Sequence, residues 1–190
     1  CRLFRVFQEH KKWAAILNVK NIGELNDLIA NGKIYDSIKV SEAIHEKTIA
    51  RIADMIHQDI QNIRIILIAG PSSSGKTTFA KRLSIQLKVL GIDTVPISMD
   101  DYFRNRSEMP RDEKGQYDFE RLDGVDVPLL NEQLKDLFDG REVLLPPYDF
   151  TTGSRTEEGR HSLKIRPGEI LILAGIHAVN DQLTPCIYAV

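Results

Sequence analysis

The sequence predicts an α/β fold in which a parallel sheet follows a small helical region. In residues 1–60 apolar positions recur at helical spacing, and from residue 63 onward short apolar runs of strand length alternate with helical segments. This alternation is typical of a parallel sheet that is covered by helices. We therefore divide the chain into a helical part, residues 1–60, and a sheet-forming domain, residues 61–190.

Three helices are predicted in the first part of the chain. They are QEHKKWAAIL, IGELNDLIANG and a longer segment that begins at Ser41. In the longer segment an apolar or threonine side chain recurs at every fourth position: Ile44, Thr48, Ile52, Ile56 and Ile60. Such a stripe needs a surface to pack on, so we expect this helix to be covered on one face.

Strands and helices are predicted in the second part as well. The strands are EILILAG, DTVPIS, REVLL and residues 63–69. EILILAG and residues 63–69 are continuous apolar runs, as parallel strands that are buried on both faces show. One helix follows residues 63–69 and ends before Gly91, and another covers residues 126–139 and ends before Gly140. Two long loops, residues 101–123 and 146–160, connect these elements.

Length, charge and cysteine usage limit the classes of protein to be considered. The chain has 190 residues and a formal net charge of −2, which suits one full core and argues against a dedicated nucleic-acid or anionic-membrane surface. No apolar run approaches the roughly 18 residues of a transmembrane helix, and no signal-peptide core begins the chain. Cys1 and Cys186 lack C-x-x-C spacing, which fits a reducing compartment. We expect a cytoplasmic protein and leave open whether it forms a homo-oligomer.

The segment GPSSSGKT matches the phosphate-binding P-loop pattern G-x-x-x-x-G-K-[ST]. In this pattern backbone N–H groups surround the phosphates, lysine reaches a phosphate and the hydroxyl reaches Mg²⁺. A strand precedes the segment and a helix follows it, so the positive end of the helix dipole faces the anion. We predict a site for a nucleoside triphosphate; the alternative is a glycine- and serine-rich turn. The nucleotide-binding residues are Gly70, Pro71, Ser72, Ser73, Ser74, Gly75, Lys76, Thr77 and Thr78.

A pair of aspartates follows the strand DTVPIS. Ligands of open α/β sheets lie beyond the carboxyl ends of the strands, so Asp100 and Asp101 are expected at the same edge as the P-loop. One carboxylate there could accept a proton from a hydroxyl that attacks a γ-phosphate, or orient Mg²⁺. If the backbone is extended, adjacent side chains point apart and only one of them enters the site. The alternative is a pair of aspartates that cap a turn or a helix.

Four segments together resemble the uridine kinase and phosphoribulokinase family of P-loop kinases: GPSSSGKTT, ISMDDYF, YDFERLDGVD and PPYDFTTGSR. The resemblance implies the three-layer parallel sheet of a P-loop kinase, incomplete at the C-terminus. It also implies that Lys76 and Asp100 are catalytic and that Thr77 and Asp100 hold Mg²⁺. The acceptor-binding residues that it implies are Asp101, Phe103, Phe119, Glu120, Tyr148 and Arg155.

The resemblance assigns parts of the acceptor site to these residues. Phe103 would lie near an acceptor nucleoside, and Phe119 and Glu120 would contact its base and ribose. Tyr148 and Arg155 belong to the segment that closes over the acceptor.

Three positions depart from the family pattern. Uridine kinases typically carry a histidine, which helps to read the pyrimidine, where this chain has Gly153. Glu120 stands where the shorter aspartate is usual, and Ala174 stands where an acidic residue usually ends the strand and helps to hold Mg²⁺. Thr77 and Asp100 would then hold the metal together with water, since Mg²⁺ tolerates several water ligands.

Two further segments, HEKTIARIAD and MPRDEKGQYDFE, are similar to a branch of long bacterial uridine kinase-related proteins. In that branch the kinase follows a part similar to the accessory domains of threonyl-tRNA synthetase, and residues 1–60 would be the tail of that part. Because the chain begins at a cysteine and has no arginine after Arg166, we expect a fragment that lacks the family's arginine-bearing lid. Such a fragment would bind ATP and transfer phosphate slowly.

These observations predict a kinase that uses ATP and Mg²⁺ to transfer the γ-phosphoryl group to a hydroxyl of a uridine-like nucleoside or a related small acceptor. The alternative is a nucleotide-responsive P-loop module that hydrolyses ATP slowly and has an RNA- or translation-linked role. Ala174 and Gly153 favour the alternative a little, whereas the acceptor segments YDFE and YDFTTGSR favour the kinase.

Overall fold

The computed structural model describes residues 2–156 and 159–183. The chain divides into two compact units, Cys1–Ile52 and Ala53–Val190. Within the described residues no helix is both long enough and apolar enough to cross a membrane. Cys186 lies outside the described residues, as does Cys1.

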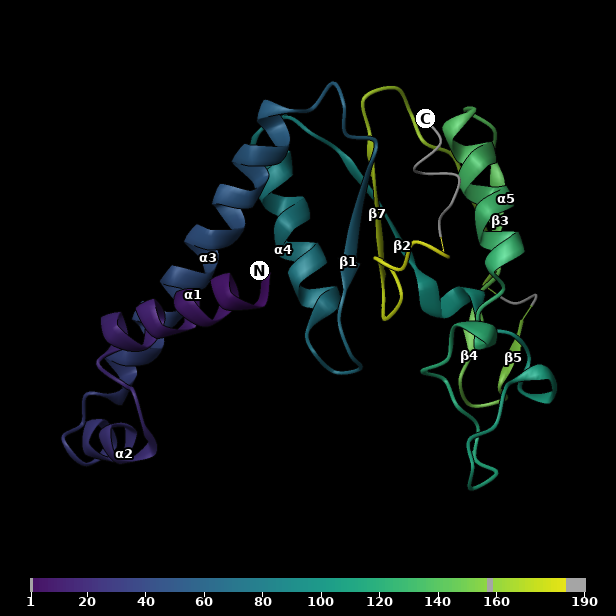
Figure 1. Ribbon diagram of the computed structural model, residues 1–190. Helices are drawn as coiled ribbons and strands as arrows, with labels where there is room; N and C mark the ends of the chain where they lie inside the picture. The colour runs from purple at the N-terminus through teal and green to yellow at the C-terminus, as the bar shows by residue number, and fades with distance from the viewer. Residues whose placement is uncertain (1, 157–158, 184–190) are drawn as a thin grey trace. The chain divides into compact units, whose positions relative to one another are not determined.

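The N-terminal unit is helical, as the apolar periodicity predicts (Figure 1). Its helices are α1, Arg2–Leu17, then α2, Ile22–Ala30, and α3, Ile34–Gln58, which continues into the second unit. α1 and α3 begin earlier than the sequence pattern suggests. At the start of α2 the Asn21 side-chain oxygen accepts the N–H of Glu24 at 3.0 Å, which satisfies one of the unpaired donors of a helix N-terminus.

A three-stranded parallel sheet forms the centre of the second unit. Its strands are β1, Ile65–Ala69, β2, Thr94–Ser98, and β7, Ile170–Gly175. They lie in the order β1-β7-β2, so Leu173 of β7 pairs with Leu67 on one side and with Ile97 on the other. The predicted parallel sheet is confirmed, with the last strand in the sequence inserted between the first two.

Helices cover both faces of this sheet. Successive side chains of β7 point to opposite faces: Leu171 and Leu173 pack in a core with α5, Val127–Phe138, while Ile172 packs with Ala80 of α4, Lys76–Val89. α4 and α5 lie on opposite sides of the sheet (Figure 1). The apolar run of β7 is therefore buried on both faces of the sheet, and the fold has three layers: helix, sheet and helix.

α4 ends just before the glycine that the sequence predicts, and a side chain caps the start of α5. After α4, Gly91 has a φ of +81°, and the N–H of Ile92 donates back to the carbonyl of Leu87 at 3.0 Å, which closes the helix end. At the start of α5 the Asp126 carboxylate accepts the N–H of Leu129 at 3.2 Å.

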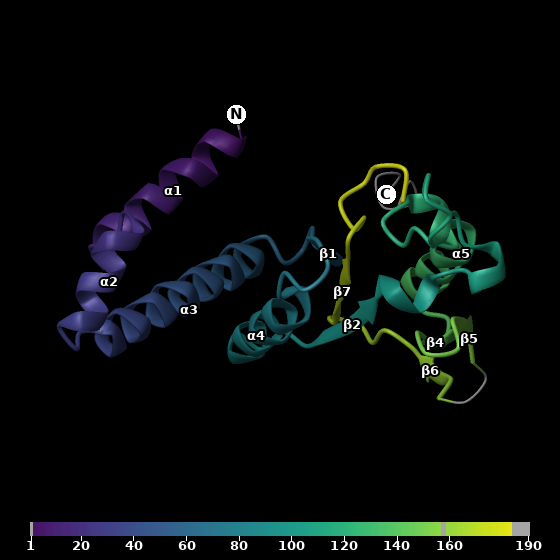
Figure 2. The same cartoon turned by 90° about the horizontal axis from the view of Figure 1, so that it is seen from below.

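The predicted strand REVLL forms, but it does not join the parallel sheet. β3, Val143–Leu145, pairs antiparallel with β6, His161–Leu163. Between them the chain folds into a hairpin of β4, Tyr148–Asp149, and β5, Ser154–Arg155. The long loop between β3 and β6 returns the chain beside β3, so that β6 runs antiparallel to it. Figure 2 shows β4, β5 and β6 gathered beside α5.

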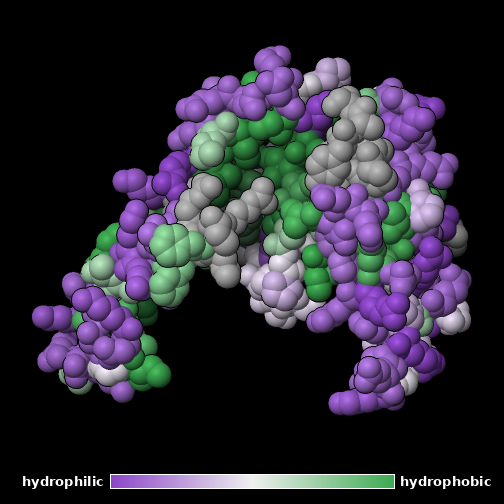
Figure 3. All heavy atoms as spheres, viewed as in Figure 1, coloured by the Kyte–Doolittle hydropathy of each residue, from purple (hydrophilic) through white to green (hydrophobic). Residues whose placement is uncertain are grey.

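One side of the sheet is covered less completely. α5 contacts β3 and the turn that follows β2, so Ile65 and Leu67 of β1 face the same core but are only half-buried. Figure 3 shows hydrophobic side chains over β1 and β7 on the side that faces the viewer. β1 is the edge strand at this side of the described sheet.

Candidate functional site

The P-loop joins the end of β1 to the start of α4, as its sequence predicts. Ser73 and Gly75 have φ values of +57° and +86°, and left-handed residues of this kind occur in the concave turns of backbone N–H groups that bind phosphate. A Cβ at Gly70 would lie 2.7 Å from the Ser74 hydroxyl, so that serine side chain would have to move. Lys76 Nζ donates to the carbonyl of Pro71 at 2.9 Å, which folds the lysine back over the loop.

A cavity of about 430 Å³ lies against this loop. Its walls are residues 72–78, Asp100, Phe103, Phe119, Glu120, Phe150 and Ile176. The structure thus brings most of the predicted nucleotide residues together with Asp100 and three of the predicted acceptor residues. Gly70, Pro71, Asp101, Tyr148 and Arg155 do not line the cavity.

Two lining residues, Phe150 and Ile176, were missed from the sequence. Phe150 lies just after β4 in the segment YDFTTGSR, and it is 53% exposed. Its place in that segment, two residues after Tyr148, was the available signal. Ile176 directly follows the carboxyl end of β7. Because ligands of open α/β sheets lie beyond the carboxyl ends of the strands, its position in the sequence was enough to predict it as a lining residue.

Asp100 belongs to a short 3-10 helix, η1, Met99–Tyr102, that begins where β2 ends. Ser98 caps it, since the hydroxyl accepts the N–H of Asp100 at 3.3 Å. Burial raises the pKa of Asp100 above its usual value, while the positive charge of Lys76 acts in the opposite direction. Asp100 is solvent-exposed at the cavity surface, so its carboxylate is only partly desolvated, and it lies within the field of the Lys76 charge.

Asp101 points elsewhere, and the reason differs from the predicted one. The two aspartates were expected to diverge because the backbone is extended, but in a 3-10 helix adjacent side chains are separated by about a third of a turn. Burial raises the pKa of Asp101, while a hydrogen bond from the Tyr148 N–H, and less strongly the charge of His161, favour its ionised form. Asp101 thus supports the hairpin β4–β5.

Aromatic rings form part of the wall of the cavity. Phe103 meets Phe119, Tyr148 and Phe150 edge-on, with ring centroids 5.4, 5.8 and 6.0 Å apart. Such pairs add to the stability that burial gives. The Tyr148 hydroxyl is buried without a hydrogen-bond partner among the described residues, so Tyr148 acts here as a support behind Phe103 and Phe150.

Gly153, one of the departures from the family pattern, is required by its surroundings. Its φ is +71°, and a Cβ at this position would overlap the guanidinium of Arg106. Arg106 in turn donates through Nη2 to the carbonyl of Phe150 at 3.0 Å, and its backbone N–H donates to the carbonyl of Gly153 at 2.7 Å. The space that a histidine side chain would need is thus taken by Arg106.

The site suits a magnesium ion with few protein ligands. Ala174 packs with Ile68 and Ile172 on the α4 face of the sheet and offers no oxygen, and the described residues contain no group of three acidic, histidine or cysteine side chains. Thr77 and Asp100 line one cavity. Mg²⁺ commonly takes one or two carboxylates and completes its shell with phosphates and water, so these donors fit it.

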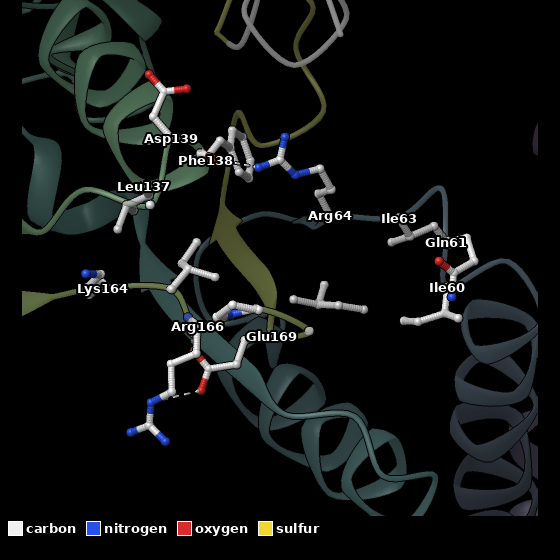
Figure 4. Close-up of a pocket in the computed structure, with 15 residues that line it drawn as sticks. Ile60, Gln61, Ile63, Arg64, Leu137, Phe138, Asp139, Lys164, Arg166 and Glu169 are labelled. Carbon is white, nitrogen blue, oxygen red and sulfur yellow. Dashed lines mark hydrogen bonds and ion pairs between the residues drawn. The ribbon is translucent and has the colours of Figure 1, made fainter.

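A second cavity, of about 670 Å³, lies at the amino ends of β1 and β7 (Figure 4). Arg64 donates to the carbonyl of Phe138 at 2.6 Å and covers its ring, and Arg166 pairs with Glu169. Ligands of open α/β sheets bind at the opposite, carboxyl ends of the strands. The cavity against the P-loop is therefore the candidate active site.

The fold and this cavity define a phosphate-binding α/β protein of the P-loop kind. The chain belongs to the Phosphoribulokinase / Uridine kinase family, whose sequence profile matches residues 65–185. Among solved structures, one described as "a Possible Uridine Kinase from Bacillus stearothermophilus" has a TM-score of 0.54 and 26% sequence identity, and the match covers 70% of this chain and 74% of that chain. The predicted family and fold class are thus confirmed.

Curated relatives match over the same part of the fold. The chain is 36% identical over 117 residues to the uridine kinase of Ligilactobacillus salivarius (strain UCC118), covering 62% of this chain and 53% of that protein. It is 34% identical over 137 residues to inorganic pyrophosphatase TTM2 of Arabidopsis thaliana, covering 72% of this chain and 18% of that protein. The chain spans about half the length of the uridine kinases it matches. The resemblance of residues 1–60 to a synthetase accessory part stays a prediction.

Replacing Asp100 by asparagine should stabilise the fold near neutral pH more than in acid. Because burial raises the pKa of Asp100 in the folded state, the penalty for its charged form appears as the pH rises through that raised pKa and is absent below the unfolded value of 3.8. Urea unfolding of wild type and Asp100→Asn, without nucleotide or metal, at about pH 7.5 and about pH 4.5 measures this difference. The exposed Asp54→Asn is the control. A stabilisation by Asp100→Asn that is equal at both pH values would contradict the desolvation of this charge.

Proposed function

We propose that the protein is a kinase that uses ATP and Mg²⁺ to phosphorylate a hydroxyl of a nucleoside-like acceptor, in the cytoplasm. The observation that carries the proposal is that one cavity is lined by the P-loop, by Asp100 and by the rings of Phe103 and Phe119. Membership of a family of phosphotransferases supports it. Because the chain spans about half the length of the uridine kinases it matches, the proposal concerns the activity of the whole protein.

The P-loop residues would hold the triphosphate. Lys76 Nζ lies 2.9 Å from the carbonyl of Pro71, so a rotation of the side chain alone can exchange that carbonyl for a phosphate oxygen. Thr77 and Asp100 would hold Mg²⁺, which when bound neutralises charge on the phosphates. Asp100 has two carboxylate oxygens, so one can face the metal while the other faces the acceptor.

Asp100 would act as the proton acceptor in the transfer step. The acceptor hydroxyl gives its proton to the carboxylate, its oxygen forms a bond to the γ-phosphorus, and the bond from that phosphorus to the β–γ bridging oxygen breaks, with the electron pair leaving on ADP. A base works best when its pKa is close to the working pH. Burial moves the pKa of Asp100 in that direction.

The lining of the cavity favours a neutral acceptor with a planar ring. Among the described lining residues three are phenylalanines, and Lys76 is the only one with a basic side chain. Lys76 is assigned to the nucleotide. The phosphate group of a phosphorylated sugar would therefore lie near the carboxylates of Asp100 and Glu120, with no other basic side chain among the described lining residues to balance its charge. A nucleoside instead offers a ring to the phenylalanines and hydroxyls to Glu120.

A slow ATPase module is the second candidate. Ala174 favours it, because a strand that ends without an acidic side chain leaves the metal with fewer protein ligands. The similarity to a protein named as a pyrophosphatase, over 18% of that protein's length, is compatible with it. Dependence of ADP release on an acceptor separates the two candidates.

Lys76→Ala should remove most of the stabilisation that MgATP gives. Ligand at a hundred times its Kd stabilises a fold by about 2.7 kcal/mol, and the lysine contributes to phosphate binding. Thermal unfolding with and without MgATP measures the shift in Tm. Lys81→Ala, an exposed lysine on the same helix, should keep the wild-type shift. Equal shifts in Lys76→Ala and wild type would show that the loop does not bind the nucleotide.

Asp100→Asn should lower acceptor-dependent ADP release by roughly 10²–10⁴ while ATP affinity stays within a few-fold, as for loss of a positioned proton acceptor. Asp101→Asn should cost much less, because Asp101 is directed at the Tyr148 N–H. A screen of nucleosides and sugar phosphates with the full-length protein supplies the acceptor for this assay. ADP release that no acceptor increases would favour the slow ATPase, and a larger loss in Asp101→Asn would move the base to Asp101.

A further inference from the structure

Arg155 joins three elements beside the candidate site without lining the cavity. Its Nε donates to the carbonyl of Phe103 at 3.1 Å, its Nη2 to the carbonyl of Tyr102 at 3.1 Å, and its Nη1 to the Asp126 carboxylate at 3.0 Å. The Arg155 and Asp126 side chains are 21% and 22% exposed. The guanidinium is thus directed at the backbone behind the site.

Asp126 contacts both Arg155 and the backbone carbonyl of Tyr102. One of its carboxylate oxygens accepts the N–H of Leu129 and caps α5, and the other accepts from Arg155. Its backbone N–H donates to the carbonyl of Tyr102 at 2.8 Å. The Tyr102 carbonyl therefore receives two donors, one from each partner of the ion pair.

The two carbonyls that Arg155 binds belong to the segment that carries the site. Tyr102 is the last residue of η1, which contains Asp100, and Phe103 follows it with its ring in the cavity wall. Fixing two successive carbonyls fixes the orientation of the peptide between them. The direction of Asp100 and the place of Phe103 both depend on that orientation.

We propose that Arg155 and Asp126 form a clamp that positions Asp100 and Phe103 for phosphoryl transfer, and that Arg155 is a positioning residue and does not bind the acceptor. The inference rests on the proposed function. Only a guanidinium suits this place, because its planar fork donates in several fixed directions at once, whereas a lysine ammonium acts as a point charge.

The alternative is that Arg155 swings out to meet the acceptor or the transferring phosphate. That movement would break three hydrogen bonds. It would also leave the Asp126 carboxylate, which is mostly buried, without its cation, and removal of one partner from a buried pair is costly. The clamp keeps all of these contacts.

A double-mutant cycle on the full-length protein tests the clamp. Arg155→Lys keeps the charge and loses the fork, and Asp126→Asn loses the charge while keeping a good helix cap. Each should lower kcat by about 10- to 100-fold, as expected when reacting groups are displaced slightly, with KM for ATP within about twofold. Because both act through one clamp, the double variant should lose little more than either single variant.

Arg166→Lys, at an exposed arginine far from the P-loop, is the matched control and should keep the wild-type kcat. The clamp is refuted if Asp126→Asn stays within about twofold of wild type while Arg155→Lys is impaired, or if the two losses multiply in the double variant. The first result would mean that Arg155 meets the reactants directly.

Amide hydrogen exchange separates this proposal from the proposed function. In Arg155→Lys the amides of Asp126 and Arg104, which donate to the carbonyls of Tyr102 and Gly124, should exchange faster, while those of α4 stay unchanged. Unchanged exchange at both amides would refute the clamp even in an active enzyme. Faster exchange in a protein that phosphorylates no acceptor would leave the clamp standing and remove the proposed function.

Discussion

The approach of Asp100 to Lys76 at the carboxyl edge of the sheet is the arrangement on which the rest of the structure depends. The lysine follows β1 and the aspartate follows β2, and β7 lies between these strands. The two groups therefore lie on either side of the end of β7. Gly175 leaves room there for Met99 at the start of η1, because a Cβ at this position would overlap the Met99 side chain.

Partial desolvation of the Asp100 carboxylate costs stability, and the surrounding structure limits the cost. Desolvation disfavours the charged form of Asp100, and the charge of Lys76 offsets part of that penalty. The short 3-10 turn that carries Asp100 is held at its far end by Arg155 and Asp126. A partly desolvated carboxylate that lines one cavity with the P-loop lysine has a physical rationale as a catalytic group.

Local signals in the sequence predicted the frame of the site, and long-range contacts decided its details. The apolar run of β7 and the glycine after α4 act within a few residues, so the pattern alone was enough to find them. The hydrogen bonds of the Arg155 side chain to Phe103 and Asp126 were not predictable, because these partners are distant in the sequence. The same holds for Gly153, whose conformation and room are decided by Arg106.

The fate of the γ-phosphoryl group tests the central claim most directly. The full-length protein is incubated with Mg²⁺, an acceptor nucleoside and ATP that carries ¹⁸O in the γ-phosphoryl group, and the products are followed by ³¹P NMR and mass spectrometry. The account predicts that the labelled group appears as a phosphate monoester of the acceptor, that all three of its non-bridging oxygens are retained, and that Asp100→Asn suppresses this product. Label that appears only in inorganic phosphate, at a rate that the acceptor does not change, would contradict a kinase and identify a hydrolase.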